Sequence, residues 1–190
     1  MEIRDFRNKV PADNFKKGRC GWTPGLFVLH TTEGSYDGSC SWFCNPKSGV
    51  SAHYVIGPGG EVTQCVDIKN TAYACGTSLL PGDKRYFKNA TNPIVKNRRA
   101  NANYFAINYE IVGAYNAVLK KCSITSKQVE TVIQLIAKDR KEIFQKFGNT
   151  IPLDRTRICG HYEVAPIAKP FCGLGFPYDE IIKGVLSFDV

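Results

Sequence analysis

Histidine is scarce in this chain, and two of its three histidines stand where chemistry is commonly carried out. His30 ends the apolar run FVLH before the polar turn TTEG, and His161 ends ICGH before a loop rich in proline and glycine. A titratable side chain at a strand end that opens into a polar loop is typical of binding and catalytic residues. His53 lies in a third strand-like run, residues 51–56. Each histidine taken alone is also compatible with a hydrogen-bonded structural role.

Two histidines from separate strand ends would supply most of a catalytic zinc site. Such a site uses three protein ligands and leaves a fourth position for water. The third ligand would be a nearby thiolate or carboxylate, and the candidates that follow His161 are Glu163, Cys172 and Asp179. A thiolate is a soft ligand that zinc accepts well. Chain spacing by itself leaves these three candidates open.

Strands and helices that would position these residues alternate along the chain. Strands are predicted at three places, residues 26–31, 105–112 and 155–161. A hairpin is predicted where the strand-like residues 51–56 and 61–66 flank the turn Gly57-Pro58-Gly59-Gly60. Hairpin and crossover connections together indicate a mixed sheet.

Two helices are expected beside this sheet. Thr125 and Gln128 form a Thr-x-x-Gln capping box, apolar residues then recur at helical spacing, and Gly148 is placed to end the helix. A short helix at residues 40–44 is ended by Asn45-Pro46. We therefore predict an α/β (mixed α+β) fold, a single domain over residues 1–190 with a central mixed β-sheet flanked by helices.

The charge balance is basic, with a formal net charge of +8 and a pI near 9.1. A basic surface favours anionic partners, which include nucleic acid, wall teichoic acid and an anionic membrane face. Six lysines and arginines lie in the segment 81–102, which shows no periodicity. We expect a solvated loop there, or an electrostatic contact with an anionic wall polymer. No nucleic-acid module surrounds it, so we expect no nucleic-acid partner.

No run of 18 apolar residues occurs, which predicts no transmembrane segment. The first residues, MEIRDFR, lack the apolar stretch of a secretory signal. Eight cysteines are present without a CxxC pair, and several have apolar neighbours, so we expect most to be reduced core residues rather than disulfides or a four-cysteine zinc site.

Four motifs occur in one order: VLHTTEG at residues 28–34, WFCNPKSGVSAHYVI at 42–56, NYFAINYEIVG at 103–113 and GHYEVAP at 160–166. Together they resemble the type-2 N-acetylmuramoyl-L-alanine amidases, a family of phage endolysins, autolysins, cytosolic muropeptide amidases and peptidoglycan recognition proteins. The resemblance spans residues 21–178. It implies the amidase-2 fold and Zn²⁺-dependent cleavage of the amide bond between N-acetylmuramic acid and L-alanine in bacterial peptidoglycan.

The resemblance also assigns roles to individual residues. It implies that His30 and His161 bind the metal and that His53 supports the site without binding it. Glu110 matches the family's catalytic glutamate, and Lys169 matches a lysine that stabilises the oxyanion. Ala52 stands where some members carry a catalytic tyrosine, which leaves Glu110 as the acid–base candidate.

Two positions depart from the family pattern. Members often carry Lys-x-Asp or Lys-x-Cys, but this chain has Lys169-Pro170-Phe171-Cys172, so the position two after the lysine is Phe171. We expect a one-residue shift of the loop to bring in Cys172 as third ligand, with Asp179 as the second choice. The run AYACG at residues 72–76 replaces a common AWHAG, so the substrate groove is expected to differ there.

The departure at Phe171 leaves two rival functions open. One is a peptidoglycan recognition protein that binds without cleaving, and the other is a cysteine hydrolase using Cys172 and His161. Within the amidase interpretation, a phage or prophage endolysin made in the host cytoplasm and released through a holin is favoured over a host autolysin or a wall-recycling enzyme. We expect either a single-module enzyme or the catalytic part of a longer one.

Overall fold

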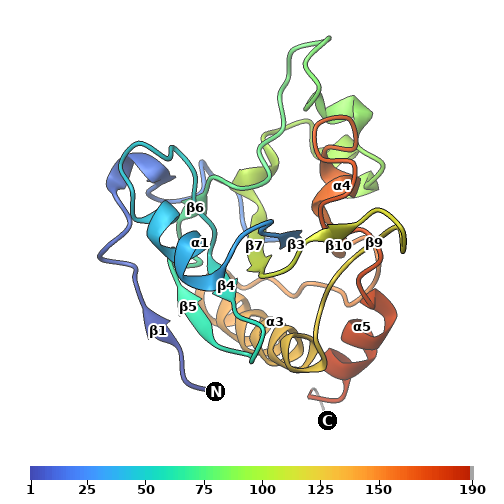
Figure 1. The fold of residues 1–190 in the computed structure, drawn as a ribbon. Helices are drawn as coiled ribbons and strands as arrows, with labels where there is room; N and C mark the ends of the chain where they lie inside the picture. Colours follow the sequence, from blue (N-terminus) through green and yellow to red (C-terminus); the bar gives the residue numbers. More distant parts are fainter. Residues whose placement is uncertain (189–190) are drawn as a thin grey trace.

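One six-stranded sheet forms the centre of the molecule, in the order β1-β5-β4-β7-β3-β10 (Figure 1). The computed structural model describes residues 1–188. The strands pair in parallel except for the antiparallel hairpin of β4 with β5. The six strands are β1 Arg4–Asp5, β3 Leu26–Thr31, β4 Tyr54–Ile56, β5 Val62–Gln64, β7 Ala106–Ile111 and β10 Ile158–Gly160. This is the mixed α/β domain that the sequence predicted.

The remaining elements are short, except for the helix α3, which has 22 residues. Two small antiparallel sheets pair β2 Phe15–Lys16 with β6 Thr71–Ala72, and β8 Tyr115–Asn116 with β9 Lys121–Cys122. The α-helices are α1 Tyr36–Phe43, α2 Pro93–Arg98, α3 Ser126–Phe147, α4 His161–Val164 and α5 Tyr178–Leu186. Three 3-10 turns complete the set, η1 Ala12–Asn14, η2 Phe87–Asn89 and η3 Ala102–Tyr104.

Alternation along the central strands gives the sheet two different faces. On β3, Phe27 and Leu29 belong to the large core cluster under α3 and α5, whereas Leu26 and Val28 belong to a second cluster with α2 and α4. By the same period of two, His30 lies on the side of Val28. The chemistry of the chain is therefore presented on the face away from the long helix.

Helix α3 covers the apolar face and is fixed at both ends as predicted. Thr125 Oγ1 accepts from Gln128 N at 3.1 Å, and Gln128 Oε1 accepts from Thr125 N at 2.9 Å. The side-chain nitrogen Nε2 of Gln128 also donates to Val112 O at 2.8 Å, so the cap connects the helix to the end of β7. Gly148 ends the helix in the left-handed region, at φ 64°.

Several local predictions need correction. Helix α1 begins four residues earlier than expected, because Ser35 caps it by accepting from Gly38 N. The segment 81–102 is not irregular throughout: it contains η2 and α2, the latter capped by Asn92 with Pro93 at its first turn. His161 does not end a strand but begins α4. Among the described residues, no helix is long and apolar enough to cross a membrane.

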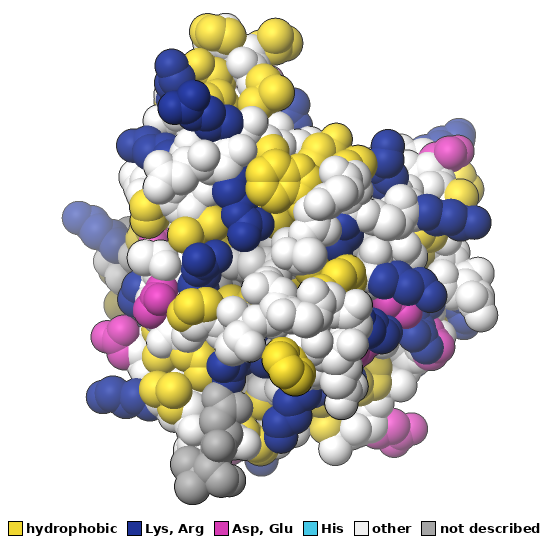
Figure 2. Space-filling view, turned by 180° about the vertical axis from the view of Figure 1, so that it is seen from behind, with side chains coloured by type: hydrophobic (Ala, Val, Ile, Leu, Met, Phe, Trp, Pro, Cys, Tyr) yellow, Lys and Arg dark blue, Asp and Glu magenta, His cyan; other side chains and the backbone are white. Residues whose placement is uncertain are grey.

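All eight cysteines are free of disulfides, as expected, and five of them are buried. Residues 77–90 form a projection that rises from the body at the top of Figure 1. Figure 2 shows hydrophobic side chains at the end of this projection and lysine and arginine side chains along its flank.

Candidate metal centre

Three parallel strands carry the candidate residues to one edge of the sheet. The register pairs His30 on β3 with Glu110 on β7, and Leu29 on β3 with Gly160 on β10. The residue after Gly160 is His161, which therefore emerges next to His30. The carboxyl ends of these parallel strands meet at one edge of the sheet, which explains the cluster.

The sheet alone thus brings together His30, Glu110 and His161, which lie far apart in the sequence.

Cys172 completes the cluster from the loop after α4. Its backbone carbonyl accepts from Tyr162 N at 3.1 Å, and its Sγ accepts from Thr31 N at 3.4 Å. The next residue, Gly173, has φ 82°, and a Cβ on it would lie 2.6 Å from Leu29 O. Only glycine allows the loop to approach β3 this closely. The loop therefore holds Cys172 next to His30 and His161.

Phe171, the residue before Cys172 in this loop, turns away from the cluster. Its ring stacks on Tyr115 of β8, with centroids 4.3 Å apart and an interplanar angle of 13°. The side chain that cannot bind metal is thus held by an aromatic contact outside the cluster. Asp179 lies on α5 and Glu163 is bonded to Arg155 and to Gly160 N, so neither joins the cluster.

The ligand atoms of His30, His161 and Cys172 all lie within 4.8 Å of one another. His30 Nδ1 is 3.9 Å from Cys172 Sγ, and the two imidazole rings are 4.6 Å apart between centroids. A tetrahedral zinc site has N···N and N···S separations of about 3.3–3.6 Å. Contraction by roughly an ångström would therefore close the three side chains on an ion. Two imidazoles and one thiol with an open fourth side are a donor set that fits catalytic zinc.

Asn108 orients the first histidine. Its Oδ1 lies 3.0 Å from His30 Nε2, and since an amide oxygen can only accept, this contact favours the tautomer of His30 that is protonated on Nε2. The lone pair of Nδ1 then faces Cys172 and Glu110. In metal-binding histidines, the ring nitrogen that does not bind the metal commonly makes a hydrogen bond of this kind. Asn108 was not among the residues predicted from the sequence, although a polar residue two positions before Glu110 in an apolar strand was a usable signal.

His53 contacts Asn108 and does not join the cluster. Its Nδ1 accepts from Asn108 N at 3.0 Å, and its Nε2 lies 3.3 Å from Asn70 O. Both ring nitrogens are therefore occupied within the protein. His53 thus lies outside the cluster, and its supporting role stays a prediction.

Burial controls the protonation of the cluster. It lowers the pKa of His30 to about 4 and the pKa of His161 well below its usual range, so both imidazoles are neutral at neutral pH. Burial raises the pKa of Cys172 to about 12, with Glu110 adding to the effect. A cation must therefore displace the thiol proton when it binds. A nucleophilic cysteine needs a lowered pKa, which argues against the cysteine-hydrolase alternative.

Glu110 is the carboxyl group of the site. Its Oε1 is 3.7 Å from His30 Nδ1, and the side chain is 14% exposed. Burial raises its pKa to about 8, and the positive charge of Lys169 opposes that rise. A carboxyl group that exchanges its proton near neutral pH is suited to general acid–base chemistry.

These groups line one open pocket of about 260 Å³. Lys169 lies on its wall together with the exposed ring of Trp42. Tyr73 and Ala74, from the run that departs from the family pattern, line it as well. The pocket thus combines the metal cluster, a carboxyl group and a cation.

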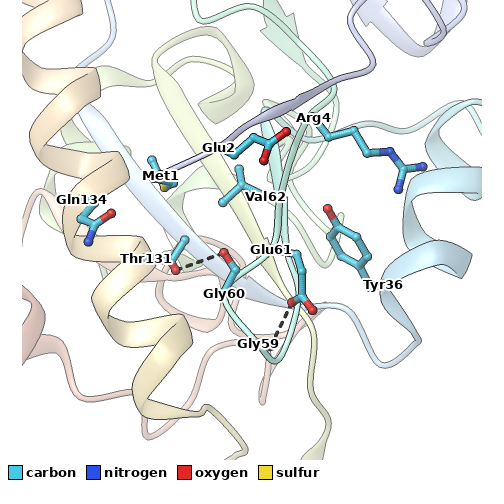
Figure 3. Close-up of a pocket in the computed structure, with 10 residues that line it drawn as sticks. All are labelled: Met1, Glu2, Arg4, Tyr36, Gly59, Gly60, Glu61, Val62, Thr131 and Gln134. Atoms are coloured by element: carbon cyan, nitrogen blue, oxygen red, sulfur yellow. Dashed lines mark hydrogen bonds between the residues drawn. The ribbon is translucent and has the colours of Figure 1, made fainter.

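A second cavity, of about 500 Å³, lies between the N-terminal residues, the β4–β5 turn and α3 (Figure 3). None of the ten residues that line it is a histidine or a cysteine. Two carboxyl groups line it, those of Glu2 and Glu61. Glu61 accepts from Gly59 N, and Thr131 donates to Gly60 O. These groups are used in closing the turn, so the candidate active site is the pocket around His30.

Comparison with known proteins places the chain in a family. Residues 22–172 match the family described as Amidase_2, N-acetylmuramoyl-L-alanine amidase. The chain belongs to this family. The match includes His30, Glu110, His161 and Cys172, and it confirms the resemblance drawn from the four motifs.

Individual relatives support the same assignment. Over 65 residues the chain is 58% identical to N-acetylmuramoyl-L-alanine amidase A of Achromobacter lyticus. That stretch covers 33% of this chain and 37% of the relative, so the chain aligns with little more than a third of that protein.

Solved structures share the fold at low sequence identity. An AmpD derivative is 20% identical with a TM-score of 0.61, covering 97% of this chain and 94% of its own. A mutant of PlyL is 15% identical with a TM-score of 0.60, covering 98% and 99%. The catalytic domain of XlyA is 16% identical with a TM-score of 0.57, covering 97% and 99%. These likenesses confirm the predicted amidase-2 fold.

Proposed function

We propose that this protein is a zinc-dependent N-acetylmuramoyl-L-alanine amidase, which cleaves the amide bond between the glycan and the stem peptide of bacterial peptidoglycan. The observation that carries the proposal is the convergence of His30, His161 and Cys172 beside Glu110 in one open pocket. Membership of the amidase family supports the substrate. A recognition protein that has lost a metal ligand is less well supported, because the loop change at Phe171 keeps Cys172 in reach.

His30, His161 and Cys172 would hold the zinc ion, with Asn108 fixing the first of them. A zinc ion held there supplies Lewis acidity for the scissile carbonyl and for the attacking water. Thr31 N donates to the sulfur and stabilises the thiolate form that binding requires.

Glu110 would take a proton from the attacking water and return it to the nitrogen of the leaving L-alanine. A divalent cation beside this carboxyl would lower its pKa toward neutrality. Lys169 would donate a hydrogen bond to the lactyl carbonyl oxygen as negative charge develops on it, a contribution of roughly 3–4 kcal/mol for a well-placed donor. The C–N bond breaks, a C–O bond forms, and the products are a carboxylate on the glycan and a free amino terminus.

Digestion of purified peptidoglycan tests this reaction. We expect new L-alanine amino termini without new reducing sugars, loss of turnover on dialysis against a chelator, and recovery with zinc. Glu110→Ala is expected to keep the metal and lose turnover. New reducing ends alone would move the cut to the glycan, and full activity after metal removal would exclude the metal mechanism.

The biological role we propose is that of a phage or prophage endolysin, released to the wall through a holin. The basic charge favours contact with anionic wall polymers, and one structural neighbour is described as an endolysin from Bacillus subtilis. Expression inside bacteria with and without a holin tests this role. Lysis only in the presence of the holin is expected, and lysis at equal rates without it would contradict the role.

A further inference from the structure

The projection formed by residues 77–90 is a built element rather than a loose loop. Ser78 N donates to Arg85 O at 2.9 Å, and Phe87 N donates to Ser78 O at 3.0 Å. Thr77 Oγ1 donates to Ala100 O at 2.9 Å, and Phe87 is buried at the base. These contacts hold the end of the projection in a fixed place outside the body of the molecule (Figure 1).

The end of the projection is apolar and exposed. Leu79 is 57% exposed and Leu80 is 71% exposed, and neither belongs to any of the three hydrophobic clusters of the described residues. Two adjacent exposed leucines of the projection therefore contribute nothing to the core. Exposed apolar groups that are held together in this way are typical of an interaction site.

The surroundings of the two leucines are cationic. The exposed side chains of Lys84, Arg85 and Lys88 lie on the projection. Lys96 follows on α2, which packs against η2, and Arg99 is the residue directly after α2. The only acidic residue between positions 77 and 99 is Asp83. Its carboxylate accepts from Arg85 N at 2.7 Å, so it is already used within the turn. Figure 2 shows the lysine and arginine side chains beside the hydrophobic end.

We propose that this projection docks the protein onto an anionic lipid bilayer. The two leucines would enter the boundary between headgroups and acyl chains, and the surrounding cations would pair with lipid phosphates. An anionic wall polymer in water would use the cations but would gain nothing from projecting leucines. A single-stranded nucleic acid would be expected to use exposed aromatic rings, which the end of the projection lacks.

Docking through the projection would leave the amidase site free. None of residues 77–90 lines the pocket that contains His30 and Glu110. The proposal therefore does not rest on the reaction, and substitutions in the projection are expected to leave hydrolysis of a soluble muropeptide unchanged.

Co-sedimentation of the whole protein with lipid vesicles tests the proposal. We expect binding to vesicles that contain phosphatidylglycerol, little binding to pure phosphatidylcholine, and steep loss of binding as salt rises to about 0.5 M. Leu79→Ser with Leu80→Ser should weaken binding by about tenfold or more. Lys84→Glu with Arg85→Glu should weaken it by about 30-fold or more.

The β8–β9 hairpin offers matched controls. Val118 is 90% exposed and Leu119 is 61% exposed, and Lys120 and Lys121 follow them. Val118→Ser with Leu119→Ser, and separately Lys120→Glu with Lys121→Glu, should change vesicle binding by less than about twofold, because each lipid contact assigned above is made elsewhere.

Three results would overturn the proposal. The first is unchanged vesicle binding by the Leu79 and Leu80 variant while its melting temperature and hydrolysis of soluble muropeptide are normal. The second is an equal loss in the hairpin controls, which would indicate unspecific apolar contact. The third is absence of vesicle binding together with binding to teichoic acid that the leucine substitutions leave intact, which would identify a polymer ligand instead.

Discussion

Replacement of Glu110 by glutamine is expected to make the metal-free protein more stable while removing its activity. The folded-state pKa of about 8 lies above the ordinary carboxyl value of 4.5, so the folded protein holds this proton more tightly than the unfolded chain does. The free energy of unfolding therefore falls as the pH rises from 4.5 through 8. Glutamine has no proton to lose and escapes this penalty.

The size of the effect follows from the shift. Each pKa unit corresponds to about 1.4 kcal/mol of unfolding free energy. The raised pKa of Glu110 therefore lowers the free energy of unfolding by at most about 3 kcal/mol at pH 7 and about 5 kcal/mol above pH 8. For a domain of this size, 1 kcal/mol moves the melting temperature by about 2–4 °C. We therefore expect Glu110→Gln to melt roughly 5–10 °C above the natural protein at pH 7 in the presence of a chelator.

Thermal melts in chelator from pH 5 to pH 8 measure this difference. The gain should be small at pH 5 and should grow with pH. Glu163→Gln is the matched control, because the Glu163 carboxylate accepts from Arg155 at 2.8 Å and from Gly160 N at 2.8 Å, and its replacement should lower stability. A difference that stays flat with pH, or a Glu110→Gln protein that is less stable at pH 8, would refute the reasoning.

Three further predictions concern the supports of the site and the core. Asn108→Leu should weaken zinc affinity about 10–100-fold, as measured by competition with a chelating dye, and unchanged affinity would exclude its orienting role. Gly173→Ala should lose bound zinc and about 2 kcal/mol or more of stability, whereas Gly18→Ala, at φ 70° with nothing within 4 Å, should lose about 1 kcal/mol and keep the zinc. The hydroxyls of Tyr54 and Tyr109 donate to the Asp139 carboxylate at 2.8 and 2.7 Å, and Asp139→Ala leaves both buried hydroxyls without this acceptor. The free energy of unfolding measured in denaturant should fall by about 3 kcal/mol, and a fall of less than about 1 kcal/mol would contradict this.

The strand ends were predictable because they combine two local signals. His30 ends one short apolar run and Glu110 lies within another, and parallel strands bring such positions to one edge. The role of Glu110 came from the family resemblance. The capping box at Thr125 is equally local, since both partners lie within one turn. The position of Cys172 needed the family resemblance, because a loop has no periodicity from which its course can be inferred.

Other features depend on contacts that no local pattern encodes. The stack of Phe171 on Tyr115 joins two loops, and the close approach of Gly173 to Leu29 O depends on the final packing. Helix α2 was missed because six residues are too few to show a period, although Asn92-Pro93 is a recognisable start. The sequence also does not show that His53 bonds Asn108, since this contact crosses from the residue before β4 to β7.

The central claim is that His30, His161 and Cys172 together hold one zinc ion. X-ray absorption at the zinc edge, on protein loaded with one equivalent of zinc, tests this most directly. We expect the zinc to have one sulfur neighbour at about 2.3 Å and nitrogen or oxygen neighbours at about 2.0–2.1 Å, and we expect Cys172→Ser to lose the sulfur. A first shell without sulfur in the natural protein, or a sulfur that persists in Cys172→Ser, would contradict it.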